Sequence, residues 1–276
     1  MSLIRKVVGN SLLGFLLVVT FLIVLFPVAW TIMSSFKLQV DMFSIPPVWF
    51  FKPTLLYYIK IFTDKPIFKS ILNSTVIASF TTIISVSVGS IAAYSLARFK
   101  FFGSRSLPVV ILFGQMIPPI TFIIPYFILM RKFALLDTHM AVIITHTCFT
   151  LSFVVWLMRS FFISIPRELE EAAIIDGCSQ IGAFLRVVVP LAAPGLATTS
   201  IFCFLYSWNE FLYALMLTGV KTQTLPVVAA SFVTPIGVLW GQLFSLVVIV
   251  MSPMLILGIL IRKHFVKGLA LGAVKG

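Results

Sequence analysis

Long runs of hydrophobic residues, separated by short polar segments, dominate this chain. Several runs exceed the roughly 20 residues that an α-helix needs to cross a bilayer. The first run is too long for a secretory signal and lacks a small-residue cleavage site. The pattern therefore predicts an all-α membrane protein, with one transmembrane domain over residues 1–276. Its six transmembrane helices are expected at 11–33, 72–97, 107–130, 139–162, 196–219 and 240–262.

The distribution of basic residues predicts the orientation of these helices. Six spans place both termini on one side, and that side carries twelve of the 20 Lys and Arg residues. Five of the other eight lie in the long loop between the first two spans, and long loops count little toward orientation. We therefore expect a multi-pass membrane protein with cytoplasmic termini.

Composition supports a membrane protein and disfavours both a nucleic-acid-binding protein and a scaffold of disulfides or metal sites. The chain is 60% hydrophobic and 10% charged, whereas soluble domains carry roughly 25% charged residues. Its net charge of +12 comes from basic residues scattered over many loops. That pattern favours contacts with anionic membrane lipid over nucleic acid, which needs a basic stripe. The three cysteines, Cys148, Cys178 and Cys203, are odd in number and widely spaced, so no disulfide framework or metal site is expected.

Two predicted spans contain residues that disturb a membrane helix. The third contains Pro118 and Pro119, which break the hydrogen-bond ladder. In lipid such a break indicates either an unwound helix lining a pathway or a kink for packing. The fifth contains Asn209 and Glu210 near its middle. A carboxylate at that depth is expensive and is expected to face an aqueous interior or a partner. If the helix is shorter, Glu210 is interfacial.

The long loop before the second span is expected to contain a short helix. Leu55, Tyr58 and Phe62 recur at helical spacing, which predicts an amphipathic helix at the outer membrane interface. Asn73 and Ser74 follow, and their side chains are expected to cap the N-terminus of the second span.

Half of the acidic residues lie in one segment between the fourth and fifth spans. Four of the eight, Glu168, Glu170, Glu171 and Asp176, lie in the loop 163–195. Ser164 and Pro166 suit a helix start, and the glutamates complement the positive end of its dipole. Gly177 then suits a left-handed stop, and Ser179 can cap a second helix near 180–188. The segment lacks the histidine or ligand triad that catalysis would need, so we expect a helix–turn–helix that docks on another protein.

The segment also resembles a known signature. Glu171-Ala172-Ala173, three residues, Gly177, nine residues, Val187, one residue and Val189-Pro190 resembles the EAA signature of bacterial ABC-importer permeases. The likeness continues in "AAYSLARFKFFG" (92–103), "SWNEFLYALML" (207–217) and "HFVKGLALGAVKG" (264–276). The likeness is strongest to the carbohydrate-type permeases, and in particular the chain is similar to the second permease of maltose-type importers. One position departs from the pattern, because Cys178 lies where relatives usually have alanine. The resemblance implies a type I ABC importer permease fold, with a cytoplasmic coupling helix between helices 4 and 5.

The resemblance also implies a place in the plasma (cytoplasmic or inner) membrane of a bacterium or archaeon, and two sets of functional residues that contact the ATPase. Docking on the ATPase is expected through Glu171, Ala172, Ala173, Asp176, Gly177 and Pro190. A second contact is expected from the tail, Gly272, Ala273, Val274, Lys275 and Gly276. Sugar passage needs hydrogen-bonding groups beside aromatic faces, and the candidates are Tyr206, Trp208, Asn209, Glu210 and Gln115. Ordinary packing between helices remains an alternative role for each of these five.

ATP chemistry is expected elsewhere in a larger complex. The chain has no G-x-x-x-x-G-K-[ST] loop, so we expect ATP and Mg to be bound by partner subunits. No cofactor, metal ligand or catalytic residue is expected in this chain. The resemblance implies a heterodimer with a second permease, two cytoplasmic ATP-binding subunits and an extracytoplasmic solute-binding protein. The expected function is that of a non-catalytic permease subunit of an ATP-driven, binding-protein-dependent sugar importer.

Two other function classes fit the sequence less well. A secondary ion-coupled transporter would need repeated halves and buried titratable groups, whereas no repeat is evident and Glu210 stands nearly alone in the spans. An intramembrane hydrolase would need a nucleophile beside a base. The sequence has no G-x-S-x-G motif that could supply a serine nucleophile for His146. We expect His146 to be a core histidine with its hydrogen bonds satisfied.

Overall fold

The computed structural model describes residues 2–104 and 106–273, with side chains described for 13–104 and 106–259. The chain divides into two compact units. The first unit combines Met1–Ile67 with Ala229–Ser252, and the second combines Phe68–Val228 with Pro253–Gly276.

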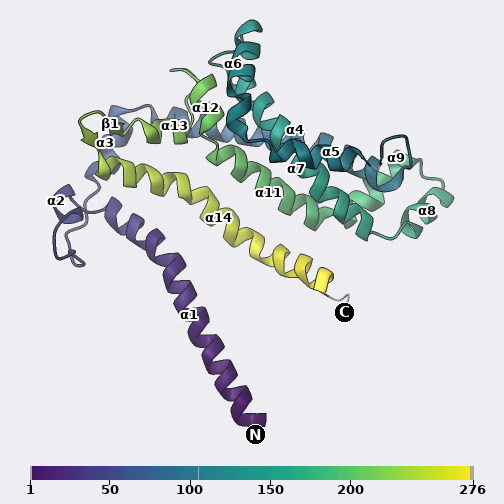
Figure 1. Ribbon diagram of the computed structural model, residues 1–276, viewed down its shortest axis with the longest axis horizontal. Coiled ribbons are helices and arrows are strands. Elements are labelled where there is room, and N and C mark those ends of the chain that lie inside the picture. The colour runs from purple at the N-terminus through teal and green to yellow at the C-terminus, as the bar shows by residue number, and fades with distance from the viewer. Residues whose placement is uncertain (1, 105, 274–276) are drawn as a thin grey trace. The chain divides into compact units, whose positions relative to one another are not determined.

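The first unit holds one long helix, two short ones and a hairpin (Figure 1). Its elements are α1 (Ser2–Ser35), α2 (Gln39–Met42), α3 (Leu56–Asp64), β1 (Val233–Thr234), β2 (Gly237–Val238) and the start of α14 (Trp240–Ala273). The two strands pair antiparallel, with Val233 opposite Val238. Tyr57 of α3 is buried, and a Cβ added to Gly241 would lie 2.5 Å from its ring. The predicted amphipathic helix of the long loop is therefore present as α3, which buries one face within its unit.

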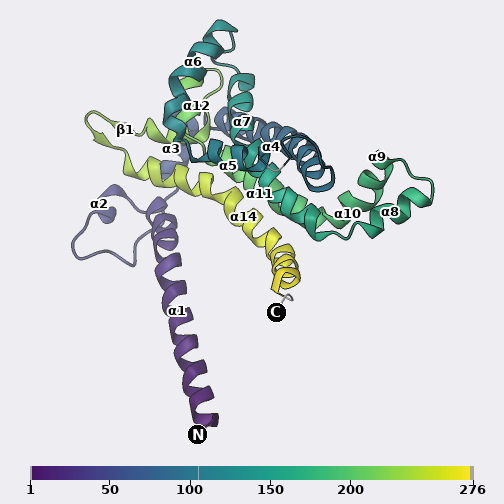
Figure 2. The same ribbon diagram turned by 45° about the vertical axis from the view of Figure 1, so that its right-hand side comes forward.

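The second unit is built around long helices that pack side by side. They are α4 (Ile67–Arg98), α5 (Leu107–Met116), α7 (His139–Ser164) and α11 (Ala193–Asn209). Figures 1 and 2 show α7 alongside both α5 and α11, and these two pairs make extensive contacts. One core cluster of this unit includes Tyr94, Val154 and Phe162, all buried. Rows of small and large apolar side chains thus hold the helices at close range.

Short helices complete the second unit at its two ends. They are η1 (Pro119–Phe122), α6 (Ile123–Lys132), α8 (Glu168–Ile175), α9 (Gln180–Ala183), the π-helical turn η2 (Phe184–Val188), α10 (Val189–Leu191), α12 (Leu212–Leu217) and α13 (Leu225–Ala230). α8 and α9 lie at one end of the long helices, and α6 and α12 lie at the other (Figures 1 and 2).

The helices supply four to six candidate membrane spans. Within the described residues, four helical segments are long and apolar enough to cross a bilayer: Leu13–Ser35, Ile67–Arg98, His139–Ser164 and Trp240–Ile259. Two bent pairs, Leu107–Met116 with Pro119–Lys132 and Gln180–Leu191 with Ala193–Asn209, bring the number to six if each pair is one span. The bends are 92° and 77°. The fold is thus the all-α membrane architecture that the hydrophobic pattern predicts.

Two local expectations are wrong in their placement. The helix α4 begins at Ile67, so Asn73 and Ser74 lie inside it and do not cap its N-terminus. Instead, Asn73 Nδ2 donates to the carbonyl oxygens of Lys221 and Gln223, at 3.3 and 3.0 Å, and Ser74 Oγ accepts from the Leu225 amide. The helix α11 ends at Asn209, so Glu210 lies at a break between helices rather than near the middle of one. The side chains of Asn73 and Ser74 thus make tertiary contacts, which the local sequence does not reveal.

A tight approach of α4 to α7 gives a first stability prediction. A Cβ at Gly89 would lie 2.6 Å from Val154 Cγ1, and Val154 is buried. We expect Gly89→Val to overpack this contact and destabilise the protein by about 1–3 kcal/mol. Thermal unfolding in detergent measures the effect. Gly114→Val is the matched control, because no atom lies within 4 Å of a Cβ at Gly114; equal losses in both variants would contradict the prediction.

Candidate coupling loop and pathway

The acidic segment folds as the predicted helix–turn–helix. Glu168–Ile175 forms α8, and Gly177 follows with φ of +91°, a left-handed conformation that suits glycine. The Cys178 amide donates to the Ala173 carbonyl at 2.9 Å, which closes the turn. Ser179 Oγ accepts from the Gly182 amide at 3.2 Å and caps α9. Residues 180–188 continue as α9 and then as the π-helical turn η2, rather than as one helix.

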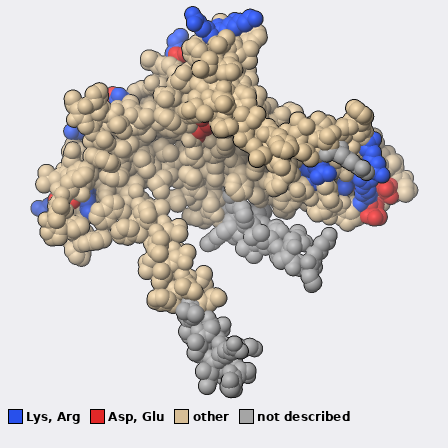
Figure 3. Space-filling view, viewed as in Figure 1, with Lys and Arg blue, Asp and Glu red and all other residues tan. Residues whose placement is uncertain are grey.

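The residues expected to dock on a partner are accessible. Five of the six are exposed and one, Ala173, is half-buried; the exposed ones are Glu171, Ala172, Asp176, Gly177 and Pro190. Large apolar side chains accompany them, with Ile175 85% exposed and Ile181 73% exposed. Figure 3 shows acidic and basic side chains gathered at the end of the second unit that holds α8. An exposed apolar surface rimmed by charge is typical of a protein interaction site.

Glu170 differs from its neighbours because its side chain turns inward. It is buried, and it forms an ion pair with Arg98 at the end of α4. Its Oε2 also accepts a hydrogen bond of 2.8 Å from Tyr94 Oη, and Arg98 Nη2 donates to the Ile165 carbonyl at 3.0 Å. By sequence alone, Glu170 is grouped with the other acids of the helix start. No local pattern distinguishes it, because Tyr94 and Arg98 lie more than 70 residues away.

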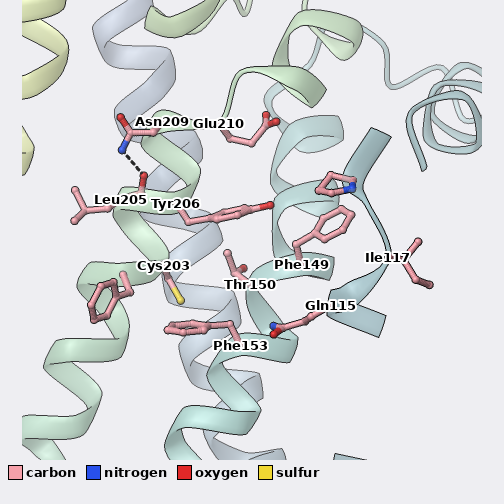
Figure 4. Close-up of a pocket in the computed structure, with 12 residues that line it drawn as sticks. Gln115, Ile117, Phe149, Thr150, Phe153, Cys203, Leu205, Tyr206, Asn209 and Glu210 are labelled. Atoms are coloured by element: carbon pink, nitrogen blue, oxygen red, sulfur yellow. Dashed lines mark hydrogen bonds between the residues drawn. The ribbon is translucent and has the colours of Figure 1, made fainter. Parts of the chain in front are cut away.

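A cavity of about 670 Å³ lies within the second unit, between α5, α7 and α11 (Figure 4). It is lined by Gln115, Ile117, Pro119, Phe149, Thr150, Phe153, Phe202, Cys203, Leu205, Tyr206, Asn209 and Glu210. Four of the five predicted pathway residues therefore share this cavity. The fifth, Trp208, is buried elsewhere and stacks on Phe204 with ring centres 5.8 Å apart.

The break in the predicted third span borders this cavity. The chain leaves α5 at Met116 and resumes as η1 at Pro119, and both Ile117 and Pro119 line the cavity. Of the two interpretations of the prolines, this placement favours an unwound segment that lines a pathway. Backbone outside a helix is tolerated at membrane depth where it borders a cavity.

Glu210 lies at the break between α11 and α12 and holds the start of α12. Its Oε1 accepts from the Tyr213 amide at 2.9 Å, and its Oε2 accepts from the Ala214 amide at 3.1 Å, so it caps the N-terminus of α12. Its Oε2 also lies 2.9 Å from His146 Nε2. His146 is fully buried, and its Nδ1 lies 2.7 Å from Ser207 Oγ. Since a carboxylate only accepts, Nε2 carries a proton, and His146 is the satisfied core histidine that the sequence predicts.

The cavity lining combines aromatic rings with a few hydrogen-bonding groups. Phe149, Phe153 and Tyr206 present ring surfaces, and the Gln115 amide lies near Phe153 (Figure 4). None of the twelve lining side chains is a Lys or Arg. Apolar walls with a small number of placed polar groups are usual in sites for small polar molecules. No group of three His, Cys, Asp or Glu that could hold a metal is found among the described residues.

A carboxylate at the opposite end of the unit from α8 fixes two loops together. Asp137 has φ of +55°, which aspartate tolerates. Its Oδ1 accepts from the Gly219 and Thr222 amides, at 2.8 and 3.1 Å, and from Thr222 Oγ1 at 2.7 Å. Partial burial would raise the pKa of Asp137, but the hydrogen bonds from Thr222, Gly219 and Lys221 outweigh it and hold that pKa below its usual value. Asp137 therefore stays ionised and ties the start of α7 to residues 219–222.

This clamp predicts a pH-dependent effect. A depressed folded-state pKa gives stability that is present above the unfolded pKa, about 3.9, and is lost as pH falls through the folded value. We expect Asp137→Asn to cost about 1 kcal/mol at pH 7, and the gap to the wild type to shrink below about pH 4. Thermal unfolding at several pH values measures it, with the exposed Asp64→Asn as control. A gap that does not change with pH would contradict the assignment.

The predicted tail contact falls largely beyond the described part of the chain. The backbone of Gly272 and Ala273 belongs to the last turn of α14, without described side chains. Val274, Lys275 and Gly276 lie outside the described residues.

Comparisons with known proteins agree on one kind of molecule. Residues 85–270 match the family model of the binding-protein-dependent transport system inner membrane component. The chain is 35% identical over 259 residues to the trehalose/maltose transport system permease protein MalG of Thermococcus litoralis, covering 92% of this chain and 93% of the relative. It is 33% identical over 261 residues to the diacetylchitobiose uptake system permease protein DasC of Streptomyces coelicolor, covering 94% and 95%.

A solved structure has the same fold. A chain of a bacterial ABC transporter involved in the import of the acidic polysaccharide alginate superposes with a TM-score of 0.78 at 23% identity, over 96% of this chain and 99% of that one.

Proposed function

The chain belongs to the binding-protein-dependent transport system inner membrane component family, and from this membership we propose that it is a permease subunit of an ATP-driven sugar importer. The observation that carries the sugar assignment is the cavity of the second unit. Its aromatic faces, amides and hydroxyls, with no basic side chain, suit an oligosaccharide. The names of relatives that transport trehalose, maltose or diacetylchitobiose support the same substrate class.

The proposed complex contains this chain as one of two different permeases. Two cytoplasmic ATP-binding subunits hold ATP and Mg, and an extracytoplasmic solute-binding protein delivers the sugar. Hydrolysis takes place on the ATP-binding subunits, and this chain is not catalytic. Both termini lie in the cytoplasm, and the tail from Gly272 to Gly276 adds a second ATPase contact. A bacterial alginate ABC transporter with the same fold has been solved in complex with an alginate pentasaccharide-bound periplasmic protein, which supports a delivering partner.

Docking is proposed through the exposed loop of α8, Gly177 and α9. Glu171 and Asp176 offer carboxylates, and Ala172 and Ala173 let a partner surface approach closely. The sharp turn at Gly177 and the cap at Ser179 fix the angle between the two short helices. Because the loop is ordered by its own hydrogen bonds, it can enter a cleft without a large cost in ordering entropy.

Movement of the docked loop reaches the membrane helices through Glu170. Closure of the ATP-binding subunits displaces α8, and the ion pair of Glu170 with Arg98 carries that displacement to the end of α4. Gly89 of α4 lies in direct contact with Val154 of α7, so α7 receives the displacement next. The cavity between α5, α7 and α11 then opens to one side or the other, a population shift driven by differential binding in the two states.

Assembly and stimulated hydrolysis test this function. We would express the chain with its partner permease and ATP-binding subunit, purify the complex in detergent, and measure ATP hydrolysis with and without the sugar-loaded binding protein. Stable co-purification and an increase in hydrolysis on adding the loaded binding protein support the proposal. The proposal would be contradicted if the chain purifies without any ATP-binding subunit, or if the rate of ATP hydrolysis does not change when the loaded binding protein is added.

A further inference from the structure

A second cavity in the second unit is strongly basic. It measures about 460 Å³ and lies between the end of α4, the loop that follows it, and α7. Its lining includes four cationic side chains: Arg98, Lys100, Arg159 and Arg167. The hydroxyls of Ser104 and Ser106 lie in the same lining. A pocket with this many donors and no carboxylate in its lining selects an anion.

Three of the four cations have no carboxylate partner among the side chains that the structure describes. Arg98 is paired with Glu170, but no ion pair involves Lys100, Arg159 or Arg167 among the described residues. Arg159 is the strongest case, because its Nε is buried and has no hydrogen-bond partner. Arg167 uses Nη2 to donate to the Ala97 carbonyl at 3.2 Å, which leaves its other donors available. A buried guanidinium donor without an acceptor is costly unless an anion is bound to it.

The donors match a phosphate group better than a carboxylate. Two guanidinium groups, an ammonium and the Ser104 hydroxyl supply more donors than the two oxygens of a carboxylate accept. The loop that supplies this hydroxyl is held by a turn at Gly103, where φ is +89° and the Leu107 amide and Ser106 Oγ donate to the Gly103 carbonyl, at 2.8 and 3.3 Å. The site is therefore built on a fixed backbone rather than on loose side chains.

The position of the cavity indicates a lipid phosphate. It lies at Arg98, the last residue of a candidate membrane span, and at Arg159, close to the end of another at Ser164. Beside the cations, Phe99 and Phe101 are 40% and 44% exposed, and Phe102 is fully exposed. Aromatic and basic side chains that alternate at a helix end are typical of the headgroup region of a bilayer.

We propose that this cavity binds the phosphate of an anionic phospholipid, with Lys100, Arg159 and Arg167 as its cationic ligands and the three phenylalanines against the acyl chains. Arg167 directly precedes α8, so a bound lipid steadies the base of the candidate coupling loop. Binding of the lipid does not depend on which substrate is transported.

The test compares lipid retention between charge variants of the purified transporter. Native mass spectrometry counts dioleoylphosphatidylglycerol retained from mixed micelles, with dioleoylphosphatidylcholine as the neutral lipid. Lys100→Gln combined with Arg167→Gln changes two exposed side chains, and each lost charge is expected to weaken phosphatidylglycerol binding about fivefold. Arg131→Gln with Lys132→Gln removes the same charge from exposed positions on α6 and is expected to leave retention unchanged. Arg159→Lys, which keeps the charge, is expected to retain most binding.

Three results would overturn the proposal. Equal phosphatidylglycerol retention in the two double variants would show that the cavity is not the site. Displacement of the lipid by millimolar inorganic phosphate as effectively as by phosphatidylglycerol would identify a soluble anion instead. Loss of the ATP-binding subunit with unchanged lipid retention would identify an acidic protein segment. If the double variant does not assemble, Lys100→Gln alone carries the test, with a loss of about fivefold expected, and transport activity stays an independent readout of the proposed function.

Discussion

Replacing Glu170 with alanine is expected to destabilise the protein far more than replacing Glu171, although the two residues are neighbours. Glu170 is buried against Arg98 and Tyr94, whereas Glu171 is exposed. Removing one partner of a buried pair leaves the other charge uncompensated and costs about 3–5 kcal/mol. An exposed glutamate away from such contacts changes stability by about 0.5 kcal/mol or less. Thermal unfolding of the purified protein measures both variants.

The same pair of variants separates structure from docking. Glu171→Ala is expected to unfold like the wild type but to lose association with the ATP-binding subunit, because its side chain faces the proposed partner. The double variant Arg98→Met with Glu170→Leu removes both buried charges, and is expected to recover most of the stability lost in Glu170→Ala. If the double variant is as unstable as the single one, the ion pair is not what anchors α8. If Glu171→Ala keeps full ATPase association, the exposed face of α8 is not the docking face.

Replacing Glu210 with alanine is the second change with a large expected effect. The carboxylate accepts hydrogen bonds from the amides of Tyr213 and Ala214 and from His146 Nε2. Its loss therefore leaves the first amides of α12 without their cap and a buried histidine donor unpaired. Hydrogen bonds to a charged group contribute about 1.5–3 kcal/mol each, and an unsatisfied buried donor costs a similar amount. We expect a total loss of about 3 kcal/mol in thermal unfolding, together with loss of transport.

Asn209→Ala is the matched control for Glu210. Asn209 lines the same cavity, but its side chain donates to the Leu205 carbonyl, one turn earlier in its own helix. Its removal is expected to leave stability within about 0.5 kcal/mol of the wild type, while sugar uptake falls if the amide contacts the substrate. Should Asn209→Ala destabilise the protein as much as Glu210→Ala, the special role assigned to the Glu210 cap would be wrong.

The sequence predicts the features that depend on near neighbours. The helix that begins at Glu168, the turn at Gly177 and the cap at Ser179 each follow from residues within one helical turn, and all three are present. The role expected of Ser164 is wrong, because Ser164 is the last residue of α7 and its Oγ donates to the Phe161 carbonyl at 2.7 Å. The buried, satisfied role of His146 is also confirmed. The length and apolarity of each span set its existence as a helix, because the bilayer imposes both.

The sequence fails where distant segments decide the outcome. Asn73 and Ser74 look like helix caps, but they hold residues 221–225, about 150 positions away. Glu170 resembles any other exposed acid until Arg98 is found beside it. Glu210 caps the nearby amides of Tyr213 and Ala214, but it also meets His146, 64 positions away, a contact that apolar periodicity does not reveal. In each case a polar side chain has a tertiary partner that the local sequence does not identify.

We propose that this chain forms part of a sugar pathway driven by ATP. The most direct measurement reconstitutes the assembled complex in proteoliposomes and follows uptake of radiolabelled oligosaccharides presented by the binding protein. We predict accumulation only when ATP and Mg are enclosed on the side of the ATP-binding subunits, unaffected by ionophores that collapse ion gradients. Accumulation without ATP that follows an imposed ion gradient would contradict this claim and identify a secondary transporter.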